Sequence, residues 1–112
     1  MIHNEKEKKL LTGVEDLVVV GVEIKKNNTF FVVAPVENLG QKTSIMMFSN
    51  EYAPLVKMLL HIPDDKILEE WDDDDIKNIP FQAEFYISEY KEKKYQKIRN
   101  FKLINDTDEI KF

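Results

Sequence analysis

The sequence predicts a mainly β domain with one or two helices. Runs rich in Val, Ile, Phe and Tyr alternate with polar residues and recur along the chain, and one segment has helical spacing instead. The chain has 112 residues, enough for one compact domain that buries a core without help. It has no cysteine and only two histidines, so disulfide frameworks, thiolate metal sites and zinc clusters are excluded.

Residues 17–36 predict a first β-hairpin. The first strand has apolar residues at alternate positions, which share one face: Val18, Val20, Val22 and Ile24. Gly21 lies among them, where a missing side chain permits a bulge or bend. Asn27 and Asn28 supply turn chemistry, and the β-rich run TFFVVAPV follows them. The hairpin therefore has a long, bendable first strand.

A third strand and a helix are predicted next. In KTSIMMFS, Ile45 and Met47 alternate with Met46 and Phe48. Ser49 or Asn50 stands at the expected N-cap, and Pro54 falls in the first turn. The helical face is then formed by residues spaced three and four apart: Leu55, Met58, Leu59 and Ile62. Since Pro63 disfavours helix at the residue before it, a helix of about three turns is expected.

The rest of the chain predicts a second hairpin after an acidic connector. DDKILEEW at 64–71 is expected to form a short helical piece, and DDDDIKN at 72–78 a solvated loop. Two β-rich runs at 80–90 and 94–104 flank the turn sequence KEK. NEKEKKLLT at 4–12 could form a short N-terminal helix.

The element order is strand, strand, strand, helix, strand, strand. It matches the OB-fold, a five-stranded Greek-key barrel with a helix between strands 3 and 4. In that fold the strand 2–3 face and the 1–2 and 4–5 loops bind oligonucleotides or oligosaccharides. We therefore expect an OB-fold domain over residues 1–104, including a short N-terminal extension, and an acidic tail over residues 105–112.

Charge is unevenly distributed along the chain. The formal net charge is −5, yet residues 64–75 contain eight acidic residues and one lysine, whereas residues 86–104 contain six basic and two acidic residues. Because exposed charges are screened beyond about 10 Å, a ligand responds to the local charge. The basic segment at 86–104 is therefore compatible with a nucleic-acid partner.

The predicted 4–5 hairpin combines the two groups that bind single strands, cations for phosphates and exposed rings for bases. Tyr90 and Tyr95 flank its turn, and cationic residues crowd it: Lys91, Lys93, Lys94, Lys97 and Arg99. Tyr86 shares the face of Tyr90. The alternative is that these lysines only keep a surface hairpin soluble and protect its edge.

Two other regions are expected to face the same groove. Lys25 and Lys26 belong to the predicted 1–2 loop. Phe30 and Phe31 must point to opposite faces of their strand, and we expect Phe31 to be exposed. Phe48 is expected to be the second exposed ring on which a base can stack. The alternative is that the helix or a second subunit covers both rings.

With this order and these residues, the chain resembles the small single-stranded DNA-binding proteins of bacteria and their phages. The resemblance covers the element order over residues 17–104 and the acidic tail with a terminal Phe. In that family the tail docks onto replication and repair enzymes, and the matching residues here are Asp106, Asp108, Glu109 and Phe112. Lys111 stands where the family usually has Pro.

These observations predict a protein that binds single-stranded DNA without catalysis, in the replication or recombination of a phage or mobile element. We find no nucleophile motif, phosphate-binding glycine loop or paired carboxylates, so no catalytic residue, metal or cofactor is expected. No apolar run is long enough to span a bilayer, so a cytoplasmic protein is expected. Self-association stays open. The alternatives are a protein-interaction module, such as an acidic DNA mimic or host-enzyme inhibitor, and a small enzyme or accessory subunit.

Overall fold

The computed structural model describes residues 10–104. Within this range it confirms the predicted fold class, a mainly β domain with one α-helix between the third and fourth strands. A short 3-10 helix, η1, follows α1. The elements in chain order are β1 (Gly13–Lys25), β2 (Asn28–Pro35), β3 (Thr43–Met46), α1 (Ser49–Leu60), η1 (Asp73–Asp75), β4 (Phe81–Tyr90) and β5 (Lys93–Leu103).

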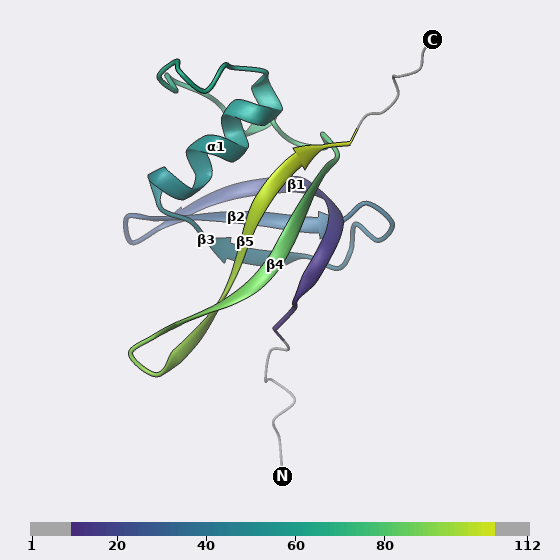
Figure 1. Ribbon diagram of the computed structural model, residues 1–112, viewed down its shortest axis with the longest axis vertical. Coiled ribbons are helices and arrows are strands. Elements are labelled where there is room, and N and C mark those ends of the chain that lie inside the picture. Colours follow the sequence, from purple (N-terminus) through teal and green to yellow (C-terminus); the bar gives the residue numbers. More distant parts are fainter. Residues whose placement is uncertain (1–9, 105–112) are drawn as a thin grey trace.

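The five strands form one antiparallel sheet in the order β3-β2-β1-β4-β5 (Figure 1). Strand β1 is shared, since its first part pairs with β4 and the rest with β2, the two ladders meeting at Leu17. The sheet curls until its edges approach, and the Lys97 Nζ of β5 donates a 2.8 Å hydrogen bond to the Met46 carbonyl oxygen of β3. This arrangement is that of the OB-fold.

A β-bulge in β1 produces its bend. The register with β2 shifts between Val19 and Gly21, as the sequence predicted. Before the shift Leu17 and Val19 face the core, and after it Val22 does. The bulge therefore divides the residues that were predicted to share one face, and that prediction is wrong for Val18, Val20, Val22 and Ile24. A Cβ added at Gly21 would meet no atom within 4 Å, so the bend depends on the extra residue and not on a missing side chain.

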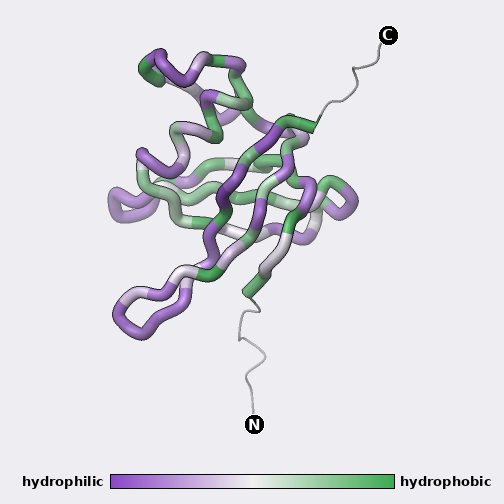
Figure 2. The backbone as a smooth tube through the Cα atoms, viewed as in Figure 1, coloured by the Kyte–Doolittle hydropathy of each residue, from purple (hydrophilic) through white to green (hydrophobic). Residues whose placement is uncertain are grey.

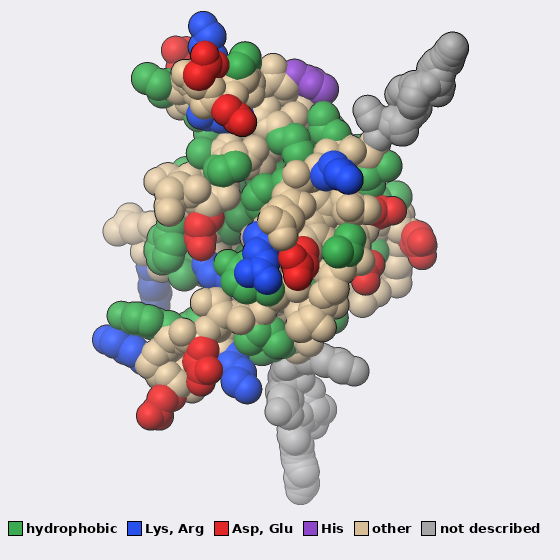
Figure 3. Space-filling model, in the orientation of Figure 1, with side chains coloured by type: hydrophobic (Ala, Val, Ile, Leu, Met, Phe, Trp, Pro, Cys, Tyr) green, Lys and Arg blue, Asp and Glu red, His purple; other side chains and the backbone are tan. Residues whose placement is uncertain are grey.

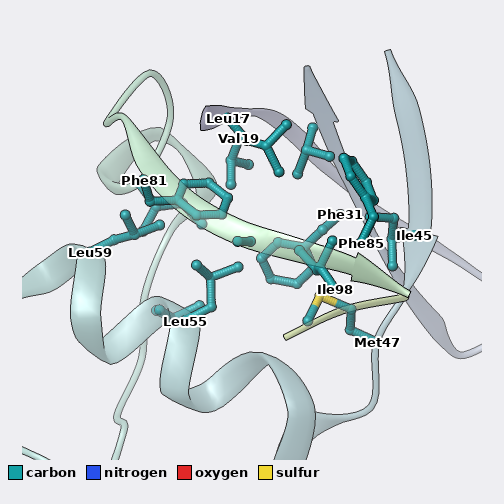
Figure 4. Close-up of a cluster of buried hydrophobic side chains, with 14 residues drawn as sticks. Leu17, Val19, Phe31, Ile45, Met47, Leu55, Leu59, Phe81, Phe85 and Ile98 are labelled. Carbon is teal, nitrogen blue, oxygen red and sulfur yellow. The ribbon is translucent and has the colours of Figure 1, made fainter. Parts of the chain in front are cut away.

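The core fills the space between the curled sheet and α1 (Figure 4). From the helix come Leu55, Val56 and Leu59, which are buried against side chains of β1, β2, β4 and β5. The largest fully buried side chains are the rings of Phe31 and Phe81. Because a buried aromatic ring is costly to remove, these two anchor the inner faces of β2 and β4.

Both hairpins turn through two residues with positive φ. Lys26 and Asn27 link β1 to β2, with φ of 50° and 66°, and Lys91 and Glu92 link β4 to β5, with φ of 52° and 65°. Such type I′ turns match the twist of the flanking strands. Lysine and glutamate rarely adopt this conformation, so the β4–β5 turn carries backbone strain.

Several local predictions differ from the structure. The N-cap of α1 is Phe48, whose N–H donates to Glu51 Oε1 at 2.8 Å, so Pro54 lies in the second turn. Residues 64–71 form no helix. The predicted N-terminal helix at 4–12 falls mostly outside the described residues, and the predicted tail at 105–112 falls entirely outside them. Over residues 10–104, no helix has the length and apolarity to cross a membrane.

Candidate nucleic-acid interface

The outer face of the β4–β5 hairpin carries a continuous row of aromatic and charged side chains. Residues directly opposite each other in an antiparallel pair share a face, and Phe85 and Ile98 occupy the inner one. The outer face therefore carries the four pairs that alternate with these residues: Tyr90–Lys93, Ser88–Tyr95, Tyr86–Lys97 and Glu84–Arg99. We call these eight residues the outer row.

The rings near the hairpin tip are accessible. Tyr90 is 62% exposed and Tyr95 37% exposed, and Phe48, on the neighbouring start of α1, is 55% exposed. The Lys91 Nζ lies 5.4 Å from the centre of the Tyr90 ring, within cation–π range. These three rings can therefore each offer a face to a stacked base.

Phe48, Tyr90 and Tyr95 line a hollow of about 570 Å³ between the hairpin and the start of α1. Its other lining residues are Met46, Glu51, Ser88, Glu89 and Lys97. In volume and in its mix of aromatic walls with few polar groups, the hollow resembles sites that bind small organic groups. Figure 3 shows hydrophobic, basic and acidic side chains gathered over the β4–β5 hairpin.

Lys97 is not the exposed phosphate contact that the sequence predicted. Lys97 is only 8% exposed. Its ammonium donates one hydrogen bond to the Met46 carbonyl and another, of 3.1 Å, to Glu51 Oε1. The same ammonium lies 5.2 Å from the centre of the Phe48 ring. Since its charge is already paired, Lys97 holds the floor of the hollow together and contributes little to phosphate neutralisation.

Arg99 is also paired, but it remains half exposed. Its guanidinium carbon lies 4.2 Å from the centre of the Tyr86 ring, and its Nε donates to Glu84 Oε1 at 3.3 Å. The hydrogen bond from Arg99, a second from Asn100 Nδ2 at 2.8 Å, and the arginine charge lower the pKa of Glu84. Tyr86 is thus covered by Arg99 and is less open to a base than Tyr90.

A second cleft, of about 560 Å³, continues from the hollow along β5 toward α1. It is lined by Tyr86 and Arg99 on the sheet side and by Pro54 and Met58 on the helix side. Glu51 lines both spaces, so they adjoin. Together they form one path from the tip of the β4–β5 hairpin to the side of the helix.

The prediction that Phe31 is exposed is wrong. Phe31 is 0% exposed and packs against Tyr52 and Trp71, with ring centres 5.3 Å and 6.0 Å away. Its neighbour Phe30 instead faces outward, paired in register with Met46. The Lys25 Nζ lies 5.8 Å from the Phe30 ring centre. Phe30 and Met46 thus extend the outer aromatic surface onto β2 and β3.

Exposed lysines flank both hairpin turns. Within residues 10–104, Lys25 pairs with Glu23 at 3.5 Å, whereas no ion pair engages four predicted cations: Lys26, Lys91, Lys93 and Lys94. All four are exposed. Both tips lie on the left of the view in Figure 1, and the β4–β5 tip is strongly hydrophilic in Figure 2. These lysines are therefore available to phosphates.

The acidic connector lies at the other end of the molecule, at the top of Figure 1. Trp71 packs the connector against the core, with its ring centre 5.8 Å from that of Tyr52. Ile76, which is fully buried, also holds the connector on the core. Ile67 is highly exposed between the acidic side chains. The predicted partner-binding tail residues, Asp106, Asp108, Glu109 and Phe112, lie outside the described residues.

Comparisons of the chain with protein-family models, with curated proteins and with solved structures find no match. The function of the outer row and the hollow must therefore be argued from their own chemistry.

Proposed function

We propose that this protein binds single-stranded DNA without catalysis, by base stacking and phosphate neutralisation along the outer face of the β4–β5 hairpin. The observation that supports this most strongly is the adjacency of three exposed rings, Phe48, Tyr90 and Tyr95, around one hollow. Exposed aromatic side chains beside unpaired lysines are what a sequence-tolerant single-strand binder needs.

In the proposed complex, bases stack on these rings while the sugar-phosphate backbone follows the lysines of the tips. Lys91 and Lys93 lie next to Tyr90 in the sheet register, so a phosphate beside a stacked base would meet a cation at once. The path then continues past the hollow into the cleft beside α1. A duplex keeps its bases stacked on each other, so it cannot use the rings.

Such a protein would protect single strands or present them during replication or recombination. The proposed partner is a single strand, and no cofactor is needed, because stacking and charge pairing require only the side chains described above.

A second candidate function is protein docking through the acidic connector. It is favoured by exposed Ile67 within a segment of eight acidic residues and one lysine, held on the core by Trp71 and Ile76. An acidic surface around an apolar residue is complementary to a basic protein surface with an apolar pocket. This is how an inhibitor or mimic of nucleic acid would act.

Fluorescence polarisation with a labelled oligo-dT of about 16 nucleotides, at low salt, tests the proposal. We expect saturable binding that unlabelled single strand displaces far more efficiently than unlabelled duplex of the same length. Absence of binding at low salt would overturn the proposed function and favour the docking candidate. Equal displacement by duplex would show that stacking on the rings does not contribute.

A further inference from the structure

We propose that Arg99 recognises guanine in the cleft between β5 and α1, by donating hydrogen bonds from its two terminal nitrogens to O6 and N7 of the base. The inference rests on the proposed function and deepens it, because it assigns a base preference to one position of an otherwise sequence-tolerant path. It follows from how the arginine is held, from the charges that line the cleft, and from which bases offer two adjacent acceptors.

The guanidinium of Arg99 is held on two sides. Its carbon lies 4.2 Å from the centre of the Tyr86 ring, and its Nε donates to Glu84 Oε1 at 3.3 Å. A guanidinium carries five N–H donors in a rigid, planar fork. Among the described residues, Arg99 donates to the protein through Nε alone, so its terminal nitrogens keep their donor capacity. Because the side chain is already ordered, a ligand that binds those nitrogens loses little free energy to its immobilisation.

A β-bulge in β5 produces this arrangement. The register between β4 and β5 shifts between Gln82 and Glu84, and on the β5 side Asn100 has a φ of 58°. Arg99 and Asn100 then both reach one glutamate, since Asn100 Nδ2 donates to the same Glu84 Oε1 at 2.8 Å. Bulges redirect side chains and are frequent beside functional sites. The strand thus departs from regular geometry at the point where it fixes Arg99.

The charges of the cleft favour a neutral base over a phosphate. Arg99 is paired with Glu84, and Glu51 is paired with Lys97. The remaining charged lining residue, Asp64, is acidic. The lining therefore offers a phosphate no unpaired positive charge, whereas the terminal N–H groups of Arg99 can still donate to an uncharged acceptor. The apolar lining gives the base a surface on which to lie: Pro54, Met58, Ile98 and Phe101.

Guanine is the base whose edges match this cleft best. Its O6 and N7 are adjacent acceptors, and a bidentate contact from arginine to them is the commonest specific contact to a DNA base. Adenine has an amino group beside N7, which would oppose an arginine N–H, and thymine has no adjacent pair of acceptors. Cytosine offers N3 and O2 in a single strand, but its one ring covers less of the apolar lining. The other edge of guanine carries donors, N1–H and the 2-amino group, which suit the carboxylates of Glu51 and Asp64.

The test compares oligo-dT strands of about nine nucleotides that differ only in one central base: guanine, hypoxanthine, 7-deazaguanine or adenine. Hypoxanthine keeps O6 and N7 but lacks the amino group of guanine, and 7-deazaguanine has a C–H group in place of N7. In fluorescence polarisation at low salt, we expect the guanine and hypoxanthine strands to bind at least about fivefold more tightly than the other two, the lower limit for a bidentate base contact. Equal binding of all the strands would overturn the inference and leave the proposed function intact, whereas no binding of any strand would overturn the proposed function.

Variants then assign the preference to the arginine. Arg99→Lys keeps the charge but lacks the fork, so the ratio of the guanine and adenine affinities should fall to near one while the salt dependence of binding stays the same. Lys102→Gln is the control, because it removes a charge from β5 at an exposed position outside the cleft, and it should keep the ratio. A guanine preference that persists in Arg99→Lys would overturn the assignment to Arg99.

Discussion

The Lys97 ammonium and the Glu51 carboxylate lie 3.1 Å apart and join three elements at the floor of the hollow. Lys97 belongs to β5, Glu51 to the first turn of α1, and the same ammonium reaches the last residue of β3 through the Met46 carbonyl. Glu51 also accepts from the N–H of Phe48. One buried lysine thus closes the gap between the sheet edges and fixes the start of the helix that carries Phe48.

Lys97→Met is therefore expected to destabilise the fold. It keeps the length of the side chain but removes the ammonium that donates to the Glu51 carboxylate and the Met46 carbonyl. We expect a loss of about 2 kcal/mol in the free energy of unfolding, at the low end for a broken buried pair because Glu51 is partly exposed. The measurement is chemical denaturation followed by Trp71 fluorescence. Lys102→Met, at an exposed position of β5, is the control and should change stability by less than about 0.5 kcal/mol.

Phe31 and Phe48 should respond to truncation in opposite ways. Phe31→Ala removes a fully buried ring and should lower the free energy of unfolding by about 3 to 5 kcal/mol. Phe48→Ala removes a ring that is mostly exposed, so it should leave the melting temperature nearly unchanged and weaken single-strand binding by about 1 to 3 kcal/mol. Thermal melts and polarisation titrations measure the two effects. A Phe48→Ala variant that binds like the wild type would remove Phe48 from the interface.

Glu84→Gln should strengthen binding, because it releases the charge of Arg99 to a phosphate. The gain should appear as a steeper salt dependence, by about 0.7 in the slope of log affinity against log salt for one added phosphate contact. Glu15→Gln, on β1 and without a resolved ion pair in the described residues, is the charge-matched control. An unchanged slope in Glu84→Gln would show that Arg99 does not reach the backbone of the strand.

The same pair predicts a pH effect with a definite sign. The pKa of Glu84 is lowered from its ordinary value near 4.5 by Arg99 and Asn100. A group whose folded-state pKa is lowered contributes stability above its unfolded pKa and loses it as pH falls through the folded value. The Arg99 pair should therefore be intact above the ordinary value of 4.5 and be lost only as the pH falls through the lower folded-state pKa. Carboxyl NMR titration measures this, and Arg99→Gln should move the Glu84 pKa back up toward its ordinary value.

The strained turn of the second hairpin offers a stabilising substitution. Glu92 has a φ of 65°, where glycine is strongly preferred in a type I′ turn. Glu92→Gly should raise the free energy of unfolding by about 0.5 to 1 kcal/mol, as measured by denaturation. Glu89→Gly, inside β4, should do the reverse. A destabilised Glu92→Gly would show that the turn conformation is not as described.

The hairpins, the helix and the element order could be predicted from the sequence because each depends on local periodicity and turn residues. Which ring of β2 faces the core could not be predicted from that strand alone, because Phe30 and Phe31 are both apolar. The partner strand of the hairpin distinguishes the two rings. A two-residue turn at Lys26–Asn27 places Phe30 opposite Glu23, and residues opposite each other share a face, so the charged Glu23 indicates that Phe30 lies on the outer face.

The burial of Lys97 had no local signal at all. It depends on the curl of the sheet, which brings β5 to β3 and to Glu51, residues about fifty positions apart in the chain. The same contact decides which cations remain for phosphates, and so the sequence overestimated the charge of the hairpin face. The exposure of Phe48 was predicted correctly, because the adjacent Met47 takes the buried position.

The salt dependence of oligo-dT binding tests the central claim most directly. If lysines at the hairpin tips neutralise phosphates, log affinity should fall linearly with log salt, by about 0.7 per contact, and Lys93→Glu with Lys94→Glu should weaken binding to every sequence alike and flatten the slope. Lys57→Glu, on α1, should leave the slope unchanged. A flat salt response in the wild-type protein would contradict the account.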